Sequence, residues 1–372
     1  MANSFGFRAV GQGLFYTGSI LDGEYKFVYD CGTENKKCYI EREVRRFSAR
    51  CRKRELEFVV LSHLHRDHFS GLIELMKYFR VKKIFLPYLG ANRNLTELVF
   101  ANSAFGERDD NEANLEENHI LFRFVQDLYN DDSVIMGAEK IFLGRESDER
   151  DSDSEFVHTH LKFTLPEVGK PYWEFHLLNK KYNAAIMKRL GDKVDELLKN
   201  NGVSSISELI YDNKIGLIKK IYEEVFGTGN KLNATSTMLV HFPVEFNKCF
   251  RFAGRSDECI CARECFHADR AVTLLTGDAE ADRREIAILN SILIDGRGIL
   301  QVPHHGSLPN WESLGNVRDY FDAMVISAGL GNRHGLPSTE TVDDILLNRN
   351  ARLYNVNQNQ GCYYSIIKDR RN

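Results

Sequence analysis

Apolar residues along the chain fall into short alternating runs, typical of strands, and into stripes with a spacing of three and four, typical of helices. The first part of this pattern predicts strands over Phe5–Val10, Leu14–Thr17 and Lys26–Tyr29, a helix over Glu41–Arg54, a strand ending at Ser62, a helix over Leu72–Arg80 and a strand over Lys82–Pro87. The last three segments form a β–α–β unit, so the pattern indicates a mixed α/β fold.

Two acidic segments in the middle of the chain, Glu107–Glu117 and Glu146–Glu155, are poor in apolar residues and are expected to be exposed loops. A helix is predicted between them, over Asn118–Tyr129. Strand-like alternation returns in three segments that we expect to build the second half of the sheet structure: Lys140–Leu143, His160–Thr164 and Trp173–Leu177.

A helical pattern then extends from Tyr182 to Phe226. Its apolar residues recur at helical spacing: Ile186, Leu190, Val194, Leu197 and Leu198. We interpret residues of about 100–135 and 180–230 as insertions between core strands. The apolar stripe favours packing within the chain, and a face that docks a protein partner is the alternative.

Three histidines and an aspartate follow the strand that ends at Ser62: His63, His65, Asp67 and His68. Imidazole and carboxylate ligands at this density suit zinc, manganese or iron. The spacing differs from that of the helical zinc protease motif, which places two histidines four residues apart on one helix face. The pattern therefore predicts a metal site, and a polar loop that caps the next helix is the alternative.

Two later strands also end in turns that carry candidate ligands. Leu274–Leu275–Thr276–Gly277 leads into Asp278, and Leu300–Gln301–Val302–Pro303 leads into His304 and His305. Because a packed sheet can direct side chains from distant sequence to one edge, we expect these residues to meet the histidine loop.

The sequence His63-Leu-His65-Arg-Asp67-His68 resembles the HxHxDH motif of the metallo-β-lactamase superfamily. Asp30, followed by Cys31 and Gly32, resembles the early Asp-x-Gly of that superfamily, Asp278 its later metal-bridging aspartate, and the His304–His305 pair its final histidine. The resemblance implies a single domain over residues 1–372 with a four-layer αβ/βα sandwich. The helical insertions and a Cys-rich hairpin at about 247–270 are expected from the sequence itself.

The resemblance also implies two divalent metal ions, zinc or manganese, with a metal-bound hydroxide as the nucleophile. One ion would be held by His63 and His65 and would share Asp278 with a second, held by Asp67, His68 and His305. We prefer His305 to His304 because it stands two residues before Ser307, as the ligand does before serine in ribonuclease Z relatives. Crowding of these groups predicts electrostatic repulsion in the metal-free chain.

Four further residues receive expected roles from the same resemblance. Asp30 would orient a ligand histidine, with a turn-forming aspartate as the alternative. Asn233 stands where many members carry a histidine ligand, so the first ion would be bound more weakly. Together with Asp67, His304 and His334 are the candidate catalytic residues, able to contact a scissile phosphate or protonate a leaving group.

The segments Asn233–Ser236, Gly277–Asp278 and His304–Ser307 resemble the hydrolase domain of ComEC-type DNA-uptake proteins, although Leu336 stands where that subgroup tends to carry a histidine. This resemblance implies cleavage of phosphodiester bonds, by a nuclease or a nucleotide phosphodiesterase acting on nucleic acid or nucleotides. The alternatives are hydrolysis of another ester, a lactone or a thioester, and an impaired binding or scaffold protein that uses the helical insertion.

A second group of soft ligands lies between two predicted strands: Cys259, Cys261, Cys265 and His267. Four such ligands within nine residues suit a structural zinc at the tip of a hairpin. Free or partly buried thiols and a disulfide are the alternatives, and a reducing compartment disfavours the disulfide.

Composition and charge narrow the classes of partner. The chain has 372 residues, 43% hydrophobic content and a formal net charge of −4, so the charge of the whole chain shows no footprint of a nucleic-acid binder. The basic segment Glu41–Arg54 favours a solvated helix face, with a phosphate contact as the alternative. No apolar run reaches the length of a membrane span and no signal sequence precedes the first strand, so we expect a cytoplasmic protein without membrane contact.

Overall fold

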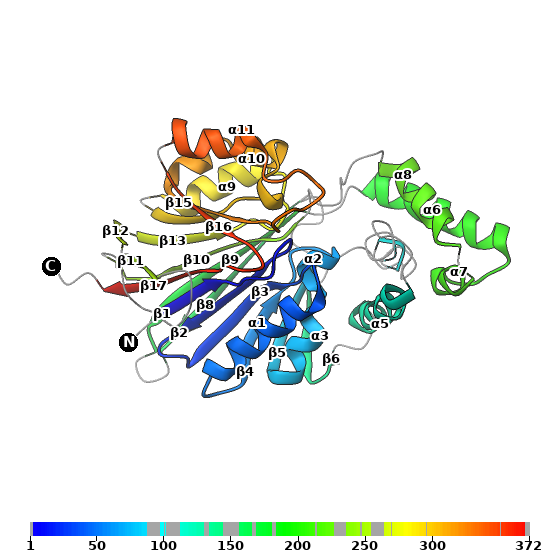
Figure 1. Cartoon of the computed structure of the whole chain (residues 1–372), viewed down its shortest axis with the longest axis horizontal. Helices are drawn as coiled ribbons and strands as arrows, with labels where there is room; N and C mark the ends of the chain where they lie inside the picture. Colours follow the sequence, from blue (N-terminus) through cyan, green and yellow to red (C-terminus); the bar gives the residue numbers. More distant parts are fainter. Residues whose placement is uncertain are drawn as a thin grey trace.

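Two β-sheets pack face to face in a computed structural model of the chain, and helices cover the outer face of each sheet (Figure 1). The structure describes residues 3–87, 97–99, 101, 112–129, 134–143, 156–165, 169–180, 184–212, 214–226, 236–245, 248–253, 264–268, 270–294, 296–349 and 351–368.

The first sheet has ten strands among the described residues. In order across the sheet they are β12 (Glu264–Ala268), β11 (Lys248–Ala253), β17 (Cys362–Lys368), β1 (Asn3–Phe7), β2 (Phe15–Ile20), β3 (Tyr25–Cys31), β4 (Glu55–Val60), β5 (Arg80–Pro87), β7 (Ala138–Leu143) and β6 (Val134–Ile135). The second sheet has seven: β16 (Arg352–Val356), β15 (Phe321–Ser327), β14 (Gly296–Gln301), β13 (Arg270–Leu275), β10 (Met238–Pro243), β9 (Pro171–Lys180) and β8 (Phe156–Thr164).

The helices connect these strands. They are α1 (Lys37–Arg50), α2 (Arg66–Phe69), α3 (Leu72–Tyr78), α5 (Glu112–Tyr129), α6 (Ala184–Asn201), α7 (Ile206–Tyr211), α8 (Ile215–Phe226), α9 (Arg283–Leu293), α10 (Leu308–Ser313) and α11 (Thr339–Asp343), with the short turns η2 (His304–Gly306), η3 (Gly315–Tyr320) and η4 (Asp344–Asn348).

Three apolar layers hold the fold together. Phe27, Trp173 and Phe175 belong to the layer between the two sheets, which is almost entirely aromatic and aliphatic. A second layer lies between the ten-stranded sheet and α1 and α3, and a third between the seven-stranded sheet and α9, α10 and α11. Each layer removes one sheet face from water, and this burial is the main force that favours folding. The predicted four-layer αβ/βα sandwich is confirmed.

Parallel pairing within each sheet determines where the functional loops lie. β3, β4, β5 and β7 run parallel in the first sheet, and β13, β14, β15 and β16 run parallel in the second. The loops that follow the carboxyl ends of parallel strands gather at one edge of a sheet, where open α/β folds bind ligands. The loops after β3, β4, β13, β14 and β15 meet in this way.

One strand was assigned to the wrong half of the fold. Lys140–Leu143 was expected in the second sheet, but β7 pairs with β5 in the first, with Ile141 opposite Phe85. The prediction is wrong because local alternation reveals a strand and carries no information on its distant partner. His160–Thr164 and Trp173–Leu177 do lie in the second sheet, as β8 and β9.

Several helix boundaries also differ from the prediction; the helix predicted over Leu72–Arg80, for example, ends at Tyr78. The basic helix starts at Lys37 and ends at Arg50, so the cluster Arg52–Arg54 lies in the turn before β4. The acidic segment Glu107–Glu117 is not all loop, because α5 already begins at Glu112. In α1 the buried carboxylate of Glu43 binds Arg42 and Arg46, which consumes part of the positive charge that a phosphate contact would need.

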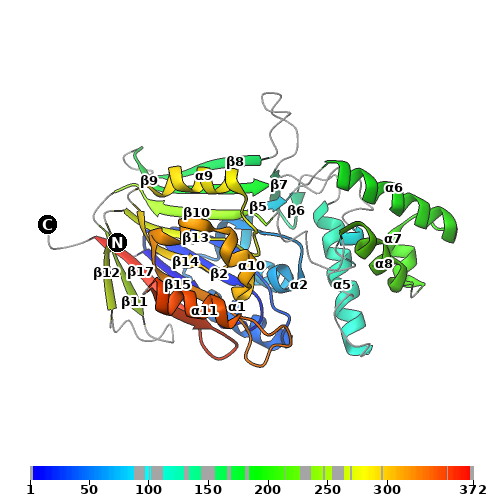
Figure 2. The ribbon, with the colours of Figure 1, turned by 90° about the horizontal axis from the view of Figure 1, so that it is seen from above.

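Both predicted insertions lie between strands that are neighbours in a sheet. α5 connects β5 to the β6–β7 hairpin, and α6, α7 and α8 connect β9 to β10. In the view from above they project together from one end of the sandwich (Figure 2). In the predicted stripe, Leu190, Val194, Leu197 and Leu198 are buried within the chain, while Ile186 is exposed.

The Cys-rich segment forms a hairpin at one edge of the first sheet, because β11 pairs with both β12 and β17. Cys259 and Cys261 lie outside the described residues, and for Cys265 and His267 the structure describes the backbone alone. Whether this group holds zinc therefore stays a prediction. In the part of the chain that the structure describes, no helix combines the length and apolarity needed to span a bilayer.

Candidate metal centre

The metal loop, which we define as Ser62–His68, connects the end of β4 to α2. Its backbone turns sharply after the buried strand, and His65 takes the extended conformation that starts α2. His63, Asp67 and His68 are buried, and His65 is half-buried. The loop therefore brings three histidines and a carboxylate together within six residues, as the sequence predicted.

Asp30 at the end of β3 contacts this loop through its buried carboxylate. Its Oδ1 accepts the backbone N–H of Ser62 at 2.7 Å, and its Oδ2 accepts the Ser62 hydroxyl at 2.7 Å and lies 2.7 Å from Nδ1 of His68. Asp30 has a φ of 54°, in the left-handed region that costs a non-glycine residue about 1–2 kcal/mol. These three contacts are those that the expected orienting role of Asp30 requires, and the role itself stays a prediction.

These contacts determine which ring nitrogens face the centre of the site. A carboxylate can only accept, so Nδ1 of His68 carries the hydrogen and its Nε2 points away from Asp30. The Ser62 hydroxyl donates to Asp30, so it accepts from Nδ1 of His63 at 3.0 Å. Both rings are thereby held with Nε2 directed toward Asp67 and Asp278.

His305 completes this arrangement from η2, after β14. Its Nδ1 donates to the carbonyl of Ser327 at 2.6 Å, and its Nε2 lies 2.8 Å from Oδ2 of Asp67. His304 and His305 have φ values of 47° and 54°, so this turn stores strain in two adjacent residues. The strained turn places His305 inside the site, whereas His304 stays at the rim.

Asp278 reaches the site from the turn after β13. Gly277 in that turn has a φ of 55°, and a Cβ there would lie 2.8 Å from the side chain of Ser62, so the close approach of the two loops requires glycine. The side chain of Gln301 accepts from the backbone N–H groups of Thr276 and Gly277, at 2.7 and 2.8 Å. Gln301 thus fixes the turn that carries Asp278.

The candidate ligands form two groups within the described residues. The first is Asp67, His68, Asp278 and His305, and the second is His63, His65 and Asp67; in each group the ligand atoms lie within 4.8 Å of one another. Asp278 also borders the second group, because its Oδ2 lies 3.5 Å from Nε2 of His63. The structure thus brings together the residues predicted for two ions, with Asp67 and Asp278 between them. Their roles as ligands stay a prediction.

The donor set fits divalent cations. Nε2 of His63 and Nε2 of His68 are fully buried and make no hydrogen bond to any residue that the structure describes. Buried polar atoms are otherwise almost always satisfied, because an unsatisfied one costs about 1–3 kcal/mol. A cation between these nitrogens and the two carboxylates would satisfy both atoms.

The pKa shifts of the candidate ligands show that carboxylates and histidines favour each other's charged forms in the metal-free site. Burial alone would raise the pKa of Asp67 and of Asp278, but neighbouring histidines hold both values well below the usual range. Burial opposes charge on His68, yet the carboxylates of Asp67, Asp278 and Asp30 raise its pKa well above its usual value. These directions run against the expected repulsion in the metal-free chain, because the histidines between the carboxylates favour their charged forms.

Two predicted residues lie apart from these groups or outside the described chain. His334 is exposed, and its Nε2 lies 3.2 Å from Oε2 of Glu34. It belongs to neither ligand group. Asn233 lies outside the described residues. The catalytic role of His334 and the ligand role of Asn233 stay predictions.

Three supporting residues escaped the sequence analysis. Gln301 is a lone polar residue at the end of an apolar strand, which is a usable signal. Ser62 is a small polar residue at a strand end, a weaker one. Asn310 orients His304, because its Nδ2 donates to the carbonyls of Asp278 and Ala279 and its Oδ1 faces Nδ1 of His304 at 3.1 Å. No local pattern marked Asn310.

One family model matches a part of the chain that includes the motif. The family model described as the Metallo-beta-lactamase superfamily matches residues 16–161, a range that includes Asp30 and the whole metal loop. Among solved structures, the chain is similar to MEM-A1, a subclass B3 metallo-beta-lactamase isolated from a soil metagenome library, with 12% identity over 48% of this chain and a TM-score of 0.20. The match covers 58% of the MEM-A1 chain. No curated protein sequence matches this chain.

Proposed function

We propose that this chain, whose residues 16–161 match the model of the Metallo-beta-lactamase superfamily, a group made up mostly of metal-dependent hydrolases, hydrolyses phosphodiester bonds as a nuclease or a nucleotide phosphodiesterase. One observation carries the proposal. The two groups of candidate ligands share Asp67, and Asp278 belongs to the first group and borders the second. Pairs of metal ions held in this way recur in phosphatases and nucleases, where they clamp the attacking and leaving oxygens of an in-line displacement. The resemblance to ComEC-type hydrolase domains supports the same substrate class.

Some side chains would bind the ions, and others orient the binding side chains. Two divalent cations, zinc or manganese, would lower the pKa of water and stabilise negative charge on phosphate oxygens. His63, His68 and His305 direct their Nε2 atoms to the centre, and Asp67 and Asp278 supply the anionic charge that a pair of dications needs. Asp30 and Ser62 hold the rings in this orientation, so little reorganisation is required when the ions bind.

His304 is the candidate proton donor for the leaving oxygen. Its Nδ1 is held by Asn310, and its Nε2 lies 3.7 Å from Oδ2 of Asp278. The side chain is 28% exposed, which places it at the rim between solvent and the ligand groups. A protonated ring in this position can donate from Nε2 to an oxygen that departs toward solvent.

The test is hydrolysis by the whole chain, with manganese or zinc, of single-stranded DNA, duplex DNA, RNA and a small chromogenic phosphodiester. A carboxylate ester, a lactone and a β-lactam serve as the competing substrates. We expect turnover of at least one phosphodiester that requires metal and is lost in Asp278→Ala. The matched control is Asp195→Ala, which removes an exposed aspartate of α6 and leaves turnover unchanged.

Each outcome distinguishes one function. Turnover of only the ester, the lactone or the β-lactam would retain the hydrolase and overturn the phosphodiester assignment. No turnover of any substrate at saturating metal, by a folded chain that binds metal, would favour the binding or scaffold function through the helical insertion.

A further inference from the structure

A second group of metal-ligand side chains lies on the β8–β9 hairpin, apart from the site already described. Within the described chain, ligand atoms of His160, Glu174 and His176 lie within 4.8 Å of one another. His160 stands directly opposite His176 in the antiparallel pair, and Glu174 is two residues before His176. Residues that alternate along a strand share a face, so all three side chains project from the same face of the hairpin.

This face is the outer one. Trp173, Phe175 and Leu177 of β9 point into the layer between the sheets, which leaves Glu174 and His176 on the opposite side. β8 is the outermost strand of the seven-stranded sheet and lies at its edge in the view from above (Figure 2). The hairpin group shares no residue with either ligand group of the metal centre.

The distances fit a tetrahedral ion. Nε2 of His160 lies 3.4 Å from Oε2 of Glu174, and Nε2 of His176 lies 3.6 Å from the same oxygen. Zinc binds imidazole nitrogen and carboxylate oxygen at about 2.0–2.2 Å, so ligand atoms at the corners of its tetrahedron are about 3.4 Å apart. The two spacings to Glu174 are therefore close to those that a zinc ion would impose, and the ligand nitrogens of the two histidines lie within 4.8 Å of each other.

A buried nitrogen of His176 gives independent evidence that a bound partner is missing. Its Nε2 is fully buried and makes no hydrogen bond to any described residue, although the imidazole ring itself is well ordered by neighbours. Its Nδ1 lies 2.9 Å from Nε2 of His158. When Nδ1 of His176 donates to His158, Nε2 keeps its lone pair and faces Glu174.

The supporting contacts match those usually found around bound metals. Ligand histidines nearly always donate their other ring N–H to a neighbour, and ligand carboxylates are themselves held by hydrogen bonds or charges. His158 supplies the first contact, and Nζ of Lys162, 3.4 Å from Oε1 of Glu174, supplies the second.

We propose that His160, Glu174 and His176 bind a further metal ion in this protein, a divalent transition metal such as Zn²⁺, with a fourth position open to solvent. Two imidazoles and a carboxylate are a donor set that zinc accepts, and harder ions such as Mg²⁺ are disfavoured by the two nitrogen ligands. The ion fastens the outermost strand β8 to β9, immediately before the chain enters the helical insertion.

The experiment uses the full chain without a histidine tag, freed of metal by chelation and dialysed against Zn²⁺ alone at a series of free concentrations. Bound zinc is counted by mass spectrometry. His160→Gln removes a half-exposed ligand at little risk to the fold, and Glu174→Gln is a second variant of unchanged shape. His119→Gln is the matched control, since it removes a histidine of α5 outside both ligand groups.

We expect each of the two ligand variants to bind one zinc ion fewer than the wild type at low free zinc, and to need at least about tenfold more zinc to regain it. His119→Gln should bind the same number as the wild type. The proposal is overturned if His160→Gln and Glu174→Gln, both folded by circular dichroism, keep the wild-type count and affinity. It is also overturned if the extra ion binds only at millimolar zinc.

Two further measurements separate this site from the proposed function. His160→Gln should keep wild-type hydrolysis, because His160 lies outside the hydrolytic site. Asp278→Ala should keep the zinc ion of the hairpin while losing hydrolysis. A failure of hydrolysis in every chain would overturn the proposed function and leave the zinc counts to decide the hairpin site independently.

Discussion

Oδ2 of Asp30 lies 2.7 Å from Nδ1 of His68, and the same carboxylate accepts two hydrogen bonds from Ser62. Three donors thus depend on one acidic side chain that no solvent reaches. An asparagine of the same shape offers a single oxygen, and its amide nitrogen would face another donor. Asp30 therefore determines the orientation of the metal loop through its charge as well as its shape.

We predict that Asp30→Asn lowers metal affinity by about 10–100-fold and leaves hydrolysis recoverable at high metal concentration. The measurement is hydrolysis of a phosphodiester against manganese concentration. Asp22→Asn is the matched control, because Asp22 also has a left-handed backbone, with a φ of 55°, but is exposed in the turn between β2 and β3. Equal metal dependence in the two variants would contradict the orienting role.

Removing a bridging carboxylate should have a larger effect than removing a neutral ligand. We predict that Asp67→Ala and Asp278→Ala abolish hydrolysis at every metal concentration, whereas Asn233→Ala only raises the concentration required. A carboxylate brings negative charge to a dication, while an amide adds one dipolar contact that water can replace. Near-normal turnover of Asp278→Ala at saturating metal would disprove the two-ion arrangement.

The same two aspartates should also affect the metal-free chain. Their pKa values are held well below the usual range, so the folded state stabilises their ionised forms. We therefore predict that Asp67→Ala and Asp278→Ala unfold at a lower urea concentration than the wild type in chelator at pH 7. Wild-type or higher stability would show that repulsion between the carboxylates prevails after all.

The sequence predicted the fold class and located the metal loop, but it did not predict every strand pairing, for physical reasons. The ligands of the metal loop are contiguous and follow a strand end, so a local pattern was sufficient to find them. The strand Ala138–Leu143 was assigned to the wrong sheet because pairing with β5 depends on contacts across 50 or so residues of intervening chain. Whether Asp67 and Asp278 are destabilised by mutual repulsion or stabilised by a neighbour depends on His68, which lies between them. Only the folded structure shows this position.

Supporting residues were hard to predict because their signals are weak. Asn310 is a polar residue in a short helix, and nothing in its local sequence marks its contact with His304. The pair His160 and His176 lies on two strands that the sequence did predict, but their meeting requires the register of β8 against β9. Register depends on many side chains at once, so it could not be derived from the spacing of the histidines alone.

Glu285 provides a pH-dependent stability that is independent of metal. It is fully buried at the start of α9, where its Oε2 accepts the backbone N–H of Asp282 at 2.9 Å, while its Oε1 makes no hydrogen bond to any described residue. Burial raises the pKa of Glu285 from 4.5 to about 7. The folded chain therefore holds a proton that the unfolded chain releases, and stability falls as pH rises from about 4.5 to 7.

We predict that Glu285→Gln is more stable than the wild type at pH 8, by roughly 1–3 kcal/mol, and nearly equal to it at pH 4.5. Glutamine remains neutral and keeps an oxygen for the Asp282 N–H. Urea unfolding in chelator at the two pH values is the measurement. Glu208→Gln is the matched control, because Glu208 occupies the equivalent position of α7 but is exposed, with a pKa lowered by Ser204. A gain at pH 8 in the control as well would point to a general effect of charge.

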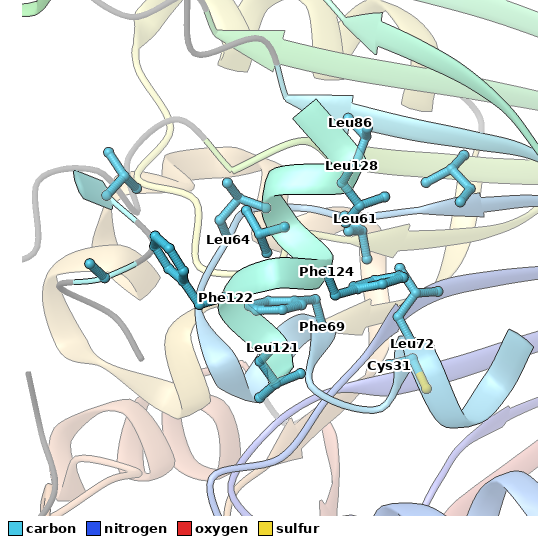
Figure 3. Packing of buried hydrophobic residues seen from close by; sticks show 14 of the residues in the cluster. Cys31, Leu61, Leu64, Phe69, Leu72, Leu86, Leu121, Phe122, Phe124 and Leu128 are labelled. Atoms are coloured by element: carbon cyan, nitrogen blue, oxygen red, sulfur yellow. The ribbon is translucent and has the colours of Figure 1, made fainter. Parts of the chain in front are cut away.

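The first insertion packs against the back of the metal loop. Figure 3 shows Phe122 of α5 beside Leu64, and Phe69 beneath the same helix. The side chain of Arg66 also donates to Asn118 of α5. Because Leu64 and Phe69 flank the ligands of the loop on its apolar side, α5 packs behind the loop and supports its conformation.

We predict that Phe122→Ala lowers the free energy of unfolding by about 3–5 kcal/mol, the usual cost of a cavity in place of a buried phenylalanine, and also weakens metal binding several-fold. The second effect follows because a cavity behind Leu64 lets His63 and His65 occupy more positions than the one that binds metal. Phe321→Ala is the matched control: Phe321 is equally apolar and 4% exposed, but it starts β15 in the layer below α9–α11. Zinc binding by equilibrium dialysis, at a temperature where both variants are folded, should then fall in Phe122→Ala alone. Equal loss of affinity in both variants would mean that metal binding follows global stability, and that α5 has no specific effect on the loop.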